Sequence, residues 1–117
     1  MTKTNPRLIK LIENLKAKSR EEDVMIWKDI AKRLERPTRN YSKVNLGQIN
    51  RNTKKNETVL VPGKVISAGI LDHPVTIAGL GFSKVAVDKI KSVKGKSIMI
   101  EQLIKDNPKG AGVRIIQ

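Results

Sequence analysis

The sequence predicts an α/β domain in which two N-terminal helices precede a long basic connection and a compact layered body of short strands and helices. Two observations support this fold class. Apolar residues recur at helical spacing in residues 1–36, whereas short apolar runs separated by glycine and proline fill residues 58–117. Helices followed by strands mixed with short helices are typical of α/β or α+β domains. At 117 residues the chain is one domain overall.

The first predicted helix begins with Asn5 as the N-cap and Pro6 at the first helical position, where the missing proline N–H leaves no helical bond unmade. Helical spacing places a stripe of five apolar residues on its inner face. These residues are Leu8, Ile9, Leu11, Ile12 and Leu15. The stripe predicts packing against a second helix.

The second helix is predicted to start at Ser19, because Ser19-Arg20-Glu21-Glu22 has the capping-box pattern. It should end by Arg36, because Pro37 disfavours helical geometry in the residue before it. Its inner face also carries five apolar residues. These are Val24, Trp27, Ile30, Ala31 and Leu34. The two stripes together predict an antiparallel helix pair.

Residues 37–57 form the predicted basic connection. The stretch from Arg36 to Asn56 holds six Lys or Arg residues and no acid. Connections of this length are uncommon inside a compact domain and are usually functional or disordered. We expect an irregular segment that contains one short helix, with Val44, Leu46 and Ile49 pinning it to the body.

Residues 58–117 form the predicted body. Strands are expected at 58–61, 64–68, 75–78, 97–100 and 113–116, and a short helix at 101–106. Pro62-Gly63 should be the centre of a type II turn. A further helix should begin after Ser83 as N-cap and close at Gly95. Its expected inward residues are Val85, Ala86, Ile90 and Val93.

Charge points to the class of partner. The net charge is +13 and the pI about 10.3, which favours nucleic acid because each neutralised phosphate releases condensed counterions. There is no cysteine, which excludes disulfides and thiolate nucleophiles. No apolar run approaches the roughly 18 residues of a membrane span, and the N-terminus does not resemble a signal peptide. A cytoplasmic location is expected.

No catalytic or metal-binding pattern is visible. His73 is the only histidine, lies beside Asp72 in an expected loop, and is interpreted as a solvated turn residue. The stretch from Gly79 to Lys84 lacks both the Walker A spacing and the third glycine of a dinucleotide fingerprint. We therefore predict no enzymatic activity, no catalytic or metal-binding residue, no cofactor and no small-molecule substrate.

Phosphate contacts are predicted in two sets. The set in the connection is Arg36, Arg39, Lys43, Arg51, Lys54 and Lys55. Asn40 and Tyr41 are candidates for base or ribose contact, since Tyr41 is the aromatic residue best placed to stack. The set on loops of the body is Lys64, Lys84, Lys109 and Arg114. Gly110 and Gly112 would let the backbone approach a phosphate closely, although a plain turn explains these two glycines equally well.

Three segments in combination resemble the archaeal branch of a family of large-subunit ribosomal proteins, the one numbered eighteen in eukaryotes. The segments are Arg36-Pro37 with Val44-Asn45-Leu46, the stretch from Glu57 to Val65, and the stretch from Asn107 to Arg114. The helix pair also fits, so the resemblance covers nearly the whole chain. It implies a three-layer α/β body, with a fold shared by the C-terminal part of bacterial large-subunit protein fifteen. It also implies large-subunit rRNA and neighbouring ribosomal proteins as partners.

The predicted function is that of a structural, rRNA-binding constituent of the large ribosomal subunit in translation. The residues leave two alternatives open. One is a free-standing nucleic-acid-binding protein of the chromatin or RNA-chaperone kind. The other is a basic peripheral membrane protein, which is disfavoured because the apolar stretch 8–15 is short and its polar face carries Glu13 beside lysines.

Overall fold

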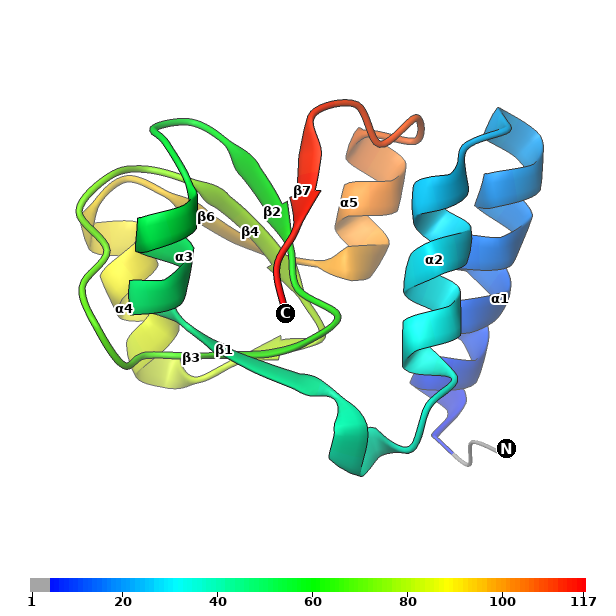
Figure 1. Ribbon diagram of the computed structural model, residues 1–117, viewed down its shortest axis with the longest axis horizontal. Helices are drawn as coiled ribbons and strands as arrows, with labels where there is room; N and C mark the ends of the chain where they lie inside the picture. The colour runs from blue at the N-terminus through cyan, green and yellow to red at the C-terminus, as the bar shows by residue number, and fades with distance from the viewer. Residues whose placement is uncertain (1–4) are drawn as a thin grey trace.

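The computed structural model describes residues 5–117 (Figure 1). Its elements are α1 (Pro6–Glu22), α2 (Met25–Leu34), the 3-10 helix η1 (Thr38–Asn40), β1 (Ser42–Asn45), α3 (Leu46–Asn52), β2 (Thr58–Leu60), β3 (Gly63–Ile66), β4 (Thr76–Gly79), β5 (Gly81–Phe82), α4 (Lys84–Ser92), β6 (Lys96–Met99), α5 (Ile100–Asp106) and β7 (Val113–Ile115). The predicted α/β class is confirmed.

The strands form two parallel sheets. One has the order β1-β3-β5 and the other β6-β4-β2-β7. Figure 1 shows α3 and α4 on one side of the four-stranded sheet, with α5, α2 and α1 on the other. Parallel sheets are covered on both faces in this way because their crossover connections carry helices.

Along the strands of the four-stranded sheet, successive residues are buried in two different hydrophobic cores. Leu60 and Ala78 pack with the apolar stripes of α1 and α2 and with α5. Val59 and Ile77 pack with α3, α4 and β3 on the other face. Side chains alternate between faces along a strand, so the run of apolar residues from Val59 to Val61 fills both cores.

The helix pair is confirmed, but the boundary between its helices is not where the sequence indicated. The Asn5 side chain accepts a hydrogen bond from the Arg7 N–H at 2.9 Å, as expected of an N-cap. Ser19, in contrast, is not an N-cap, since α1 continues to Glu22 and α2 begins at Met25. The Ser19 hydroxyl instead donates to the Val24 carbonyl at 2.6 Å and closes the turn between the helices.

The inner faces of the two helices follow the predicted stripes with two exceptions. Ile9 is 40% exposed, so it does not widen the stripe of α1, and Val24 is only partly buried. The remaining stripe residues are buried. They are Leu8, Leu11, Ile12, Leu15, Trp27, Ile30, Ala31 and Leu34.

The basic connection is more regular than the sequence indicated. Residues 42–45 form β1, which pairs with β3, and residues 46–52 form α3. Val44, Leu46 and Ile49 are fully buried in the second core, which confirms that they pin this segment to the body. Burial of these three side chains explains the regular structure, because it fixes the backbone between them.

Pro62-Gly63 is not the centre of a type II turn. Gly63 begins β3 and lies opposite Ser42 of β1, and its φ is not among the positive values that such a turn requires. A Cβ atom at Gly63 would lie 2.0 Å from the Ser42 carbonyl oxygen. Glycine is therefore needed here for the close approach of two strands.

Gly63→Ala should consequently destabilise the fold by about 1–3 kcal/mol or more, because backbone rather than a flexible side chain must move. The measurement is the free energy of unfolding in urea. Gly81→Ala is the matched control, since no atom lies within 4 Å of the corresponding Cβ position. Equal stabilities for the two variants would contradict this account of β1–β3 packing.

Helix α4 is capped as expected at its start but not at its end. The Ser83 hydroxyl accepts a hydrogen bond from the Ala86 N–H at 3.2 Å. The left-handed residue after the helix is Lys94, with φ 63°, rather than Gly95. Ala86 and Ile90 are buried, whereas Val85 is 52% exposed and was wrongly assigned to the inner face.

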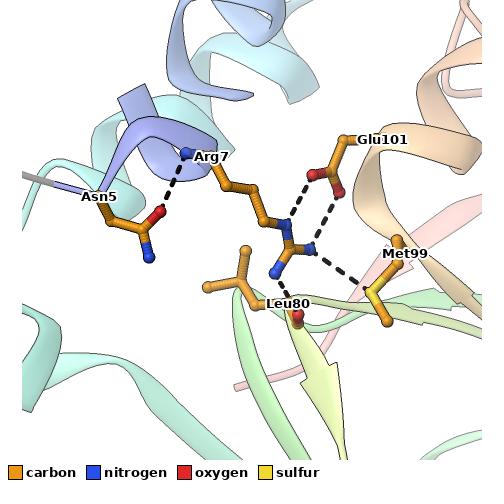
Figure 2. A network of polar contacts seen from close by, with 5 residues as sticks. All are labelled: Asn5, Arg7, Leu80, Met99 and Glu101. Carbon is orange, nitrogen blue, oxygen red and sulfur yellow. Dashed lines mark hydrogen bonds and ion pairs between the residues drawn. The ribbon is translucent and has the colours of Figure 1, made fainter. Parts of the chain in front are cut away.

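An arginine network fastens α1 to the body (Figure 2). The Arg7 guanidinium donates to both carboxylate oxygens of Glu101, at 2.8 and 3.1 Å, and to the Leu80 carbonyl at 2.7 Å. One of its nitrogens also lies 3.4 Å from the Met99 sulfur. Hydrogen bonding between the two charged groups lowers the pKa of Glu101 and raises the pKa of Arg7. This contact was not predicted from the sequence, since its partners are far apart in the chain.

Glu101→Gln should lower the free energy of unfolding at pH 7 by about 1 kcal/mol or less, because the ion pair is partly exposed and screened. The lowered pKa of Glu101 means that its stabilisation is present above the ordinary value of 4.5 and is lost as the pH falls through the folded-state pKa. Denaturation of both proteins from pH 7 to pH 3 checks this. A difference in stability that persists at the acid end would contradict it, and Asp88→Asn, at an exposed carboxylate, is the control.

Candidate nucleic-acid interface

The outer face of the three-stranded sheet carries two lysines side by side. Lys43 of β1 is the register partner of Lys64 of β3, and both are exposed. Val44 and Val65, the next residues in each strand, are fully buried, so strand alternation turns both lysines outward. Neighbouring strands lie about 4.8 Å apart, and like charges directly opposite one another destabilise a sheet. An anion bound at this position would relieve the repulsion.

Gly81 of β5 completes the row. It is the register partner of Lys64 on the side away from Lys43. No atom lies within 4 Å of the place where a Gly81 Cβ would stand. The row therefore has two cations and one position without a side chain, which leaves the sheet open beside Lys64.

An open groove of about 610 Å³ lies at this row. It is lined by Thr38, Arg39, Tyr41, Lys43, Lys64, Leu80 and Gly81, and we call it the strand groove. It joins three cations from η1, β1 and β3 that sequence analysis assigned to two separate sets. Within the described residues, none of the three side chains forms a hydrogen bond or ion pair, and no acid lines the groove.

Tyr41 has a structural role that the stacking prediction overlooked. Its hydroxyl donates to the Leu34 carbonyl at the end of α2. Its ring is partly buried and packs against the first core. Tyr41 therefore ties η1 to the helix pair. Asn40 and Arg36 are exposed near it, and base or ribose contact by Asn40 or Tyr41 stays a prediction.

The remaining cations of the connection lie elsewhere. Arg51 is in the last turn of α3, and Lys54 and Lys55 are exposed in the turn that leads to β2. Figure 1 places this turn at the top of the view and η1 at the bottom. The six basic residues that look like one segment in the sequence are thus divided between two ends of the molecule.

Two further lysines lie beside the α3–β2 turn. The Asn56 N–H donates to the Pro74 carbonyl at 2.7 Å and holds the turn against the start of β4. A cavity of about 240 Å³ next to it is lined by these residues together with Lys94 and Lys96. Neither lysine was predicted as a contact, because no local motif distinguishes the two from other surface lysines.

Arg114 makes contacts within the protein. One guanidinium nitrogen donates to the Asn52 carbonyl at 2.6 Å, and another lies 3.2 Å from a Glu57 carboxylate oxygen. The other Glu57 oxygen accepts from the Lys54 N–H. Arg114 therefore closes the α3–β2 turn over β7, and its guanidinium is only partly available to an outside ligand.

The glycine loop before β7 is explained largely by packing on α2. The Trp27 indole N–H donates to the Pro108 carbonyl at 2.6 Å. Gly110 has φ 65°, and a Cβ there would lie 2.6 Å from the Ile26 side chain. Gly112 also has positive φ but faces open space, and Lys109 is exposed. Close approach of a phosphate is thus possible at Gly112 rather than at Gly110.

Lys84 begins α4 and is exposed. The Ser83 side chain already satisfies one N–H group at this helix start. Lys84 is therefore a surface cation at a partly capped helix terminus.

His73 is not the solvated turn residue that the sequence indicated. Its Nδ1 lies 2.9 Å from an Asp72 carboxylate oxygen and its Nε2 lies 2.9 Å from the Thr53 hydroxyl. Only 17% of its side chain is exposed. The hydrogen bond from His73 lowers the pKa of Asp72. His73 thereby links the loop before β4 to the end of α3.

In residues 5–117, no three His, Cys, Asp or Glu side chains gather as possible metal ligands. None of the helices in that range has the length and apolarity needed to cross a membrane.

Comparisons with known proteins give a consistent result. The chain is 57% identical to large ribosomal subunit protein eL18 of Methanoregula boonei, over 98% of this chain and 95% of the relative. It is 50% identical to the eL18 protein of Methanothermobacter thermautotrophicus, over 100% and 97%. It is 47% identical to that of Haloarcula marismortui, over the full length of both. No family model matches the chain.

A parallel α/β fold with a groove that, among residues 5–117, is lined by three cations and no acid is that of a protein suited to a polyanion. The likeness to the three relatives, over 95–100% of their lengths, places the chain within ribosomal proteins of the large subunit. The chain belongs to the archaeal family of large ribosomal subunit protein eL18, a family of structural proteins without enzymatic activity. The resemblance noted in the sequence is confirmed.

Proposed function

We propose that the chain is a structural constituent of the large ribosomal subunit in translation, located in cytoplasmic ribosomes, and that it binds rRNA mainly through phosphate contacts. Family membership supports the large-subunit role. The observation that supports phosphate contacts is the strand groove. Among the described residues, its lining includes Arg39, Lys43 and Lys64 and no carboxylate. Lysine and arginine that meet without an acid are suited to the negative charge of an RNA backbone.

The other predicted site residues are proposed to contribute to RNA binding to different extents. Tyr41 lines the strand groove, and Arg36 and Asn40, its exposed neighbours in the chain, would extend it. Lys54 and Lys55 lie in the α3–β2 turn, whose Asn56 lines a cavity with Lys94 and Lys96, and these four lysines would form a separate basic edge. Arg51 would add a contact from the last turn of α3. Lys84, Lys109 and Gly112 would add single contacts. Arg114 and Gly110 act first in holding loops, for the reasons given above, and contact RNA only with their remaining exposed atoms.

Sedimentation separates this function from that of a free-standing nucleic-acid-binding protein. Native lysate is fractionated on a sucrose gradient at moderate salt, and the chain is followed with an antibody. We expect it to sediment with the large subunit and with neighbouring ribosomal proteins. Distribution over the light fractions would favour the chromatin or RNA-chaperone alternative and would contradict the proposal.

A further inference from the structure

A second cationic groove lies between α1 and α2. It has a volume of about 310 Å³ and is lined by Lys16, Ser19, Arg20, Lys28, Lys32 and Glu35. We call it the helix groove. It shares no residue with the strand groove, and none of its residues was predicted as a contact from the sequence. Its cations come in pairs one helical turn apart, Lys16 with Arg20 on α1 and Lys28 with Lys32 on α2.

The charges in the helix groove are poorly compensated. Lys16 pairs with Glu35 at 3.1 Å. Within the described residues, Arg20, Lys28 and Lys32 have no hydrogen-bonding or ion-pair partner for their side chains. Like charges four residues apart destabilise a helix. Lys28 is also in the first turn of α2, where the helix dipole disfavours a cation and no acid is present.

Three other cations of the helix pair have carboxylate partners. Arg7 pairs with Glu101, Lys18 with Glu21 at 3.0 Å, and Arg33 with Asp29 at 3.2 Å. In the described part of α1 and α2, the cations without a carboxylate partner are Lys10 and the three in the helix groove. Solvation of a scattered surface charge explains Lys10. It does not explain why the other three face one groove.

We propose that the helix groove is a second RNA-binding surface, which holds the phosphates of an RNA segment between α1 and α2. This inference rests on the proposed function, because RNA is then the polyanion within reach. The lining favours RNA over an acidic protein. Every lining residue is polar or charged, whereas the centre of a protein–protein interface is depleted of lysine and enriched in aromatic and apolar residues.

The consequence is that one molecule contacts RNA from two sets of elements. The strand groove is built on η1, β1, β3 and β5, and the helix groove on α1 and α2. Figure 1 shows α1 and α2 at the right of the view and β1 and β3 at the lower left. Two such surfaces would let the chain fix the relative position of two RNA segments, or of two parts of one segment.

The absence of cysteine allows a site-specific test in the intact particle. Lys28→Cys and Lys64→Cys variants, each carrying a tethered Fe(II)-EDTA group that cleaves nearby RNA, are assembled into large subunits. We expect the Lys28→Cys probe to cleave large-subunit rRNA as strongly as the Lys64→Cys probe. Cleavage from Lys64→Cys alone would overturn the inference and leave the proposed function standing. Cleavage from neither probe would defeat both.

A second measurement keeps the inference testable if assembly of Lys28→Cys fails. Arg20, Lys28 and Lys32 are replaced together by glutamine, and binding to transcribed large-subunit rRNA is measured against salt. The slope of log affinity against log salt should become shallower by about 2–3, at 0.7–0.9 per lost phosphate contact. Lys10, Lys91 and Lys105 replaced by glutamine form the control with the same change in charge. Equal slopes for the two triple variants would overturn the inference. Binding to an acidic polypeptide such as polyglutamate is measured in parallel. If the helix-groove variant loses binding to polyglutamate but binds rRNA like wild type, the inference is also overturned.

Discussion

Replacing Arg39, Lys43 and Lys64 by glutamine should weaken rRNA binding about 100-fold at roughly 0.15 M salt, because three phosphate contacts with their counterion release are lost. Folding stability should stay within about 0.5 kcal/mol of wild type, since all three side chains are exposed. Removal of the Lys43–Lys64 repulsion acts in the stabilising direction. Filter binding and urea denaturation measure the two quantities.

The control for this variant is the replacement of Lys10, Lys91 and Lys105, which changes the net charge equally at exposed positions outside the strand groove. We expect it to lose much less affinity than the strand-groove variant. Equal losses would mean that only total charge matters. Unfolding of the strand-groove variant would instead assign a structural role to these three cations.

Val61→Asp should unfold the domain. Val61 is fully buried in the second core, and its N–H donates to the Ala78 carbonyl at 2.8 Å. A carboxylate there has no partner, and burying a charge costs several kcal/mol, which is comparable with a whole-domain stability of roughly 5–15 kcal/mol. Circular dichroism of the purified variant measures the loss of structure.

Val85→Asp is the matched control. Val85 is 52% exposed in the first turn of α4, where the helix dipole favours a negative charge. This variant should fold like wild type. A folded Val61→Asp protein would contradict the arrangement of the two cores on either face of the four-stranded sheet.

Periodicity predicted the two N-terminal helices but not all of their ends, and it did not predict β1 or β5. The stripes of α1 and α2 follow from spacing alone, because only one face of each helix can be buried. Ser19 was misassigned because its capping-box sequence lies inside α1, which continues to Glu22. Asn5 was assigned correctly because Pro6 restricts the start of α1 independently. Local patterns are reliable when two independent signals agree, as at Asn5 and Pro6.

The strand groove could not be predicted from the sequence without knowing which strands pair. Lys43 and Lys64 were both predicted as contacts, but in separate sets, since parallel pairing joins residues far apart in the chain. Separation along the chain also hid the ion pair of Arg114 in β7 with Glu57 and that of Arg7 in α1 with Glu101 in α5. Charge composition indicated a class of ligand, and the register of β1 with β3 was needed to bring Lys43 and Lys64 together.

The salt dependence of rRNA binding tests the central claim most directly, when it is measured for wild type and for the Arg39, Lys43 and Lys64 variant together. For about six to ten phosphate contacts, wild-type affinity should fall by about three to five decades between roughly 50 and 200 mM monovalent salt. The slope for the variant should be shallower by about 2–3, which is close to one for each lost contact. A salt-independent wild-type affinity, or identical slopes for the two proteins, would contradict phosphate recognition by the strand groove.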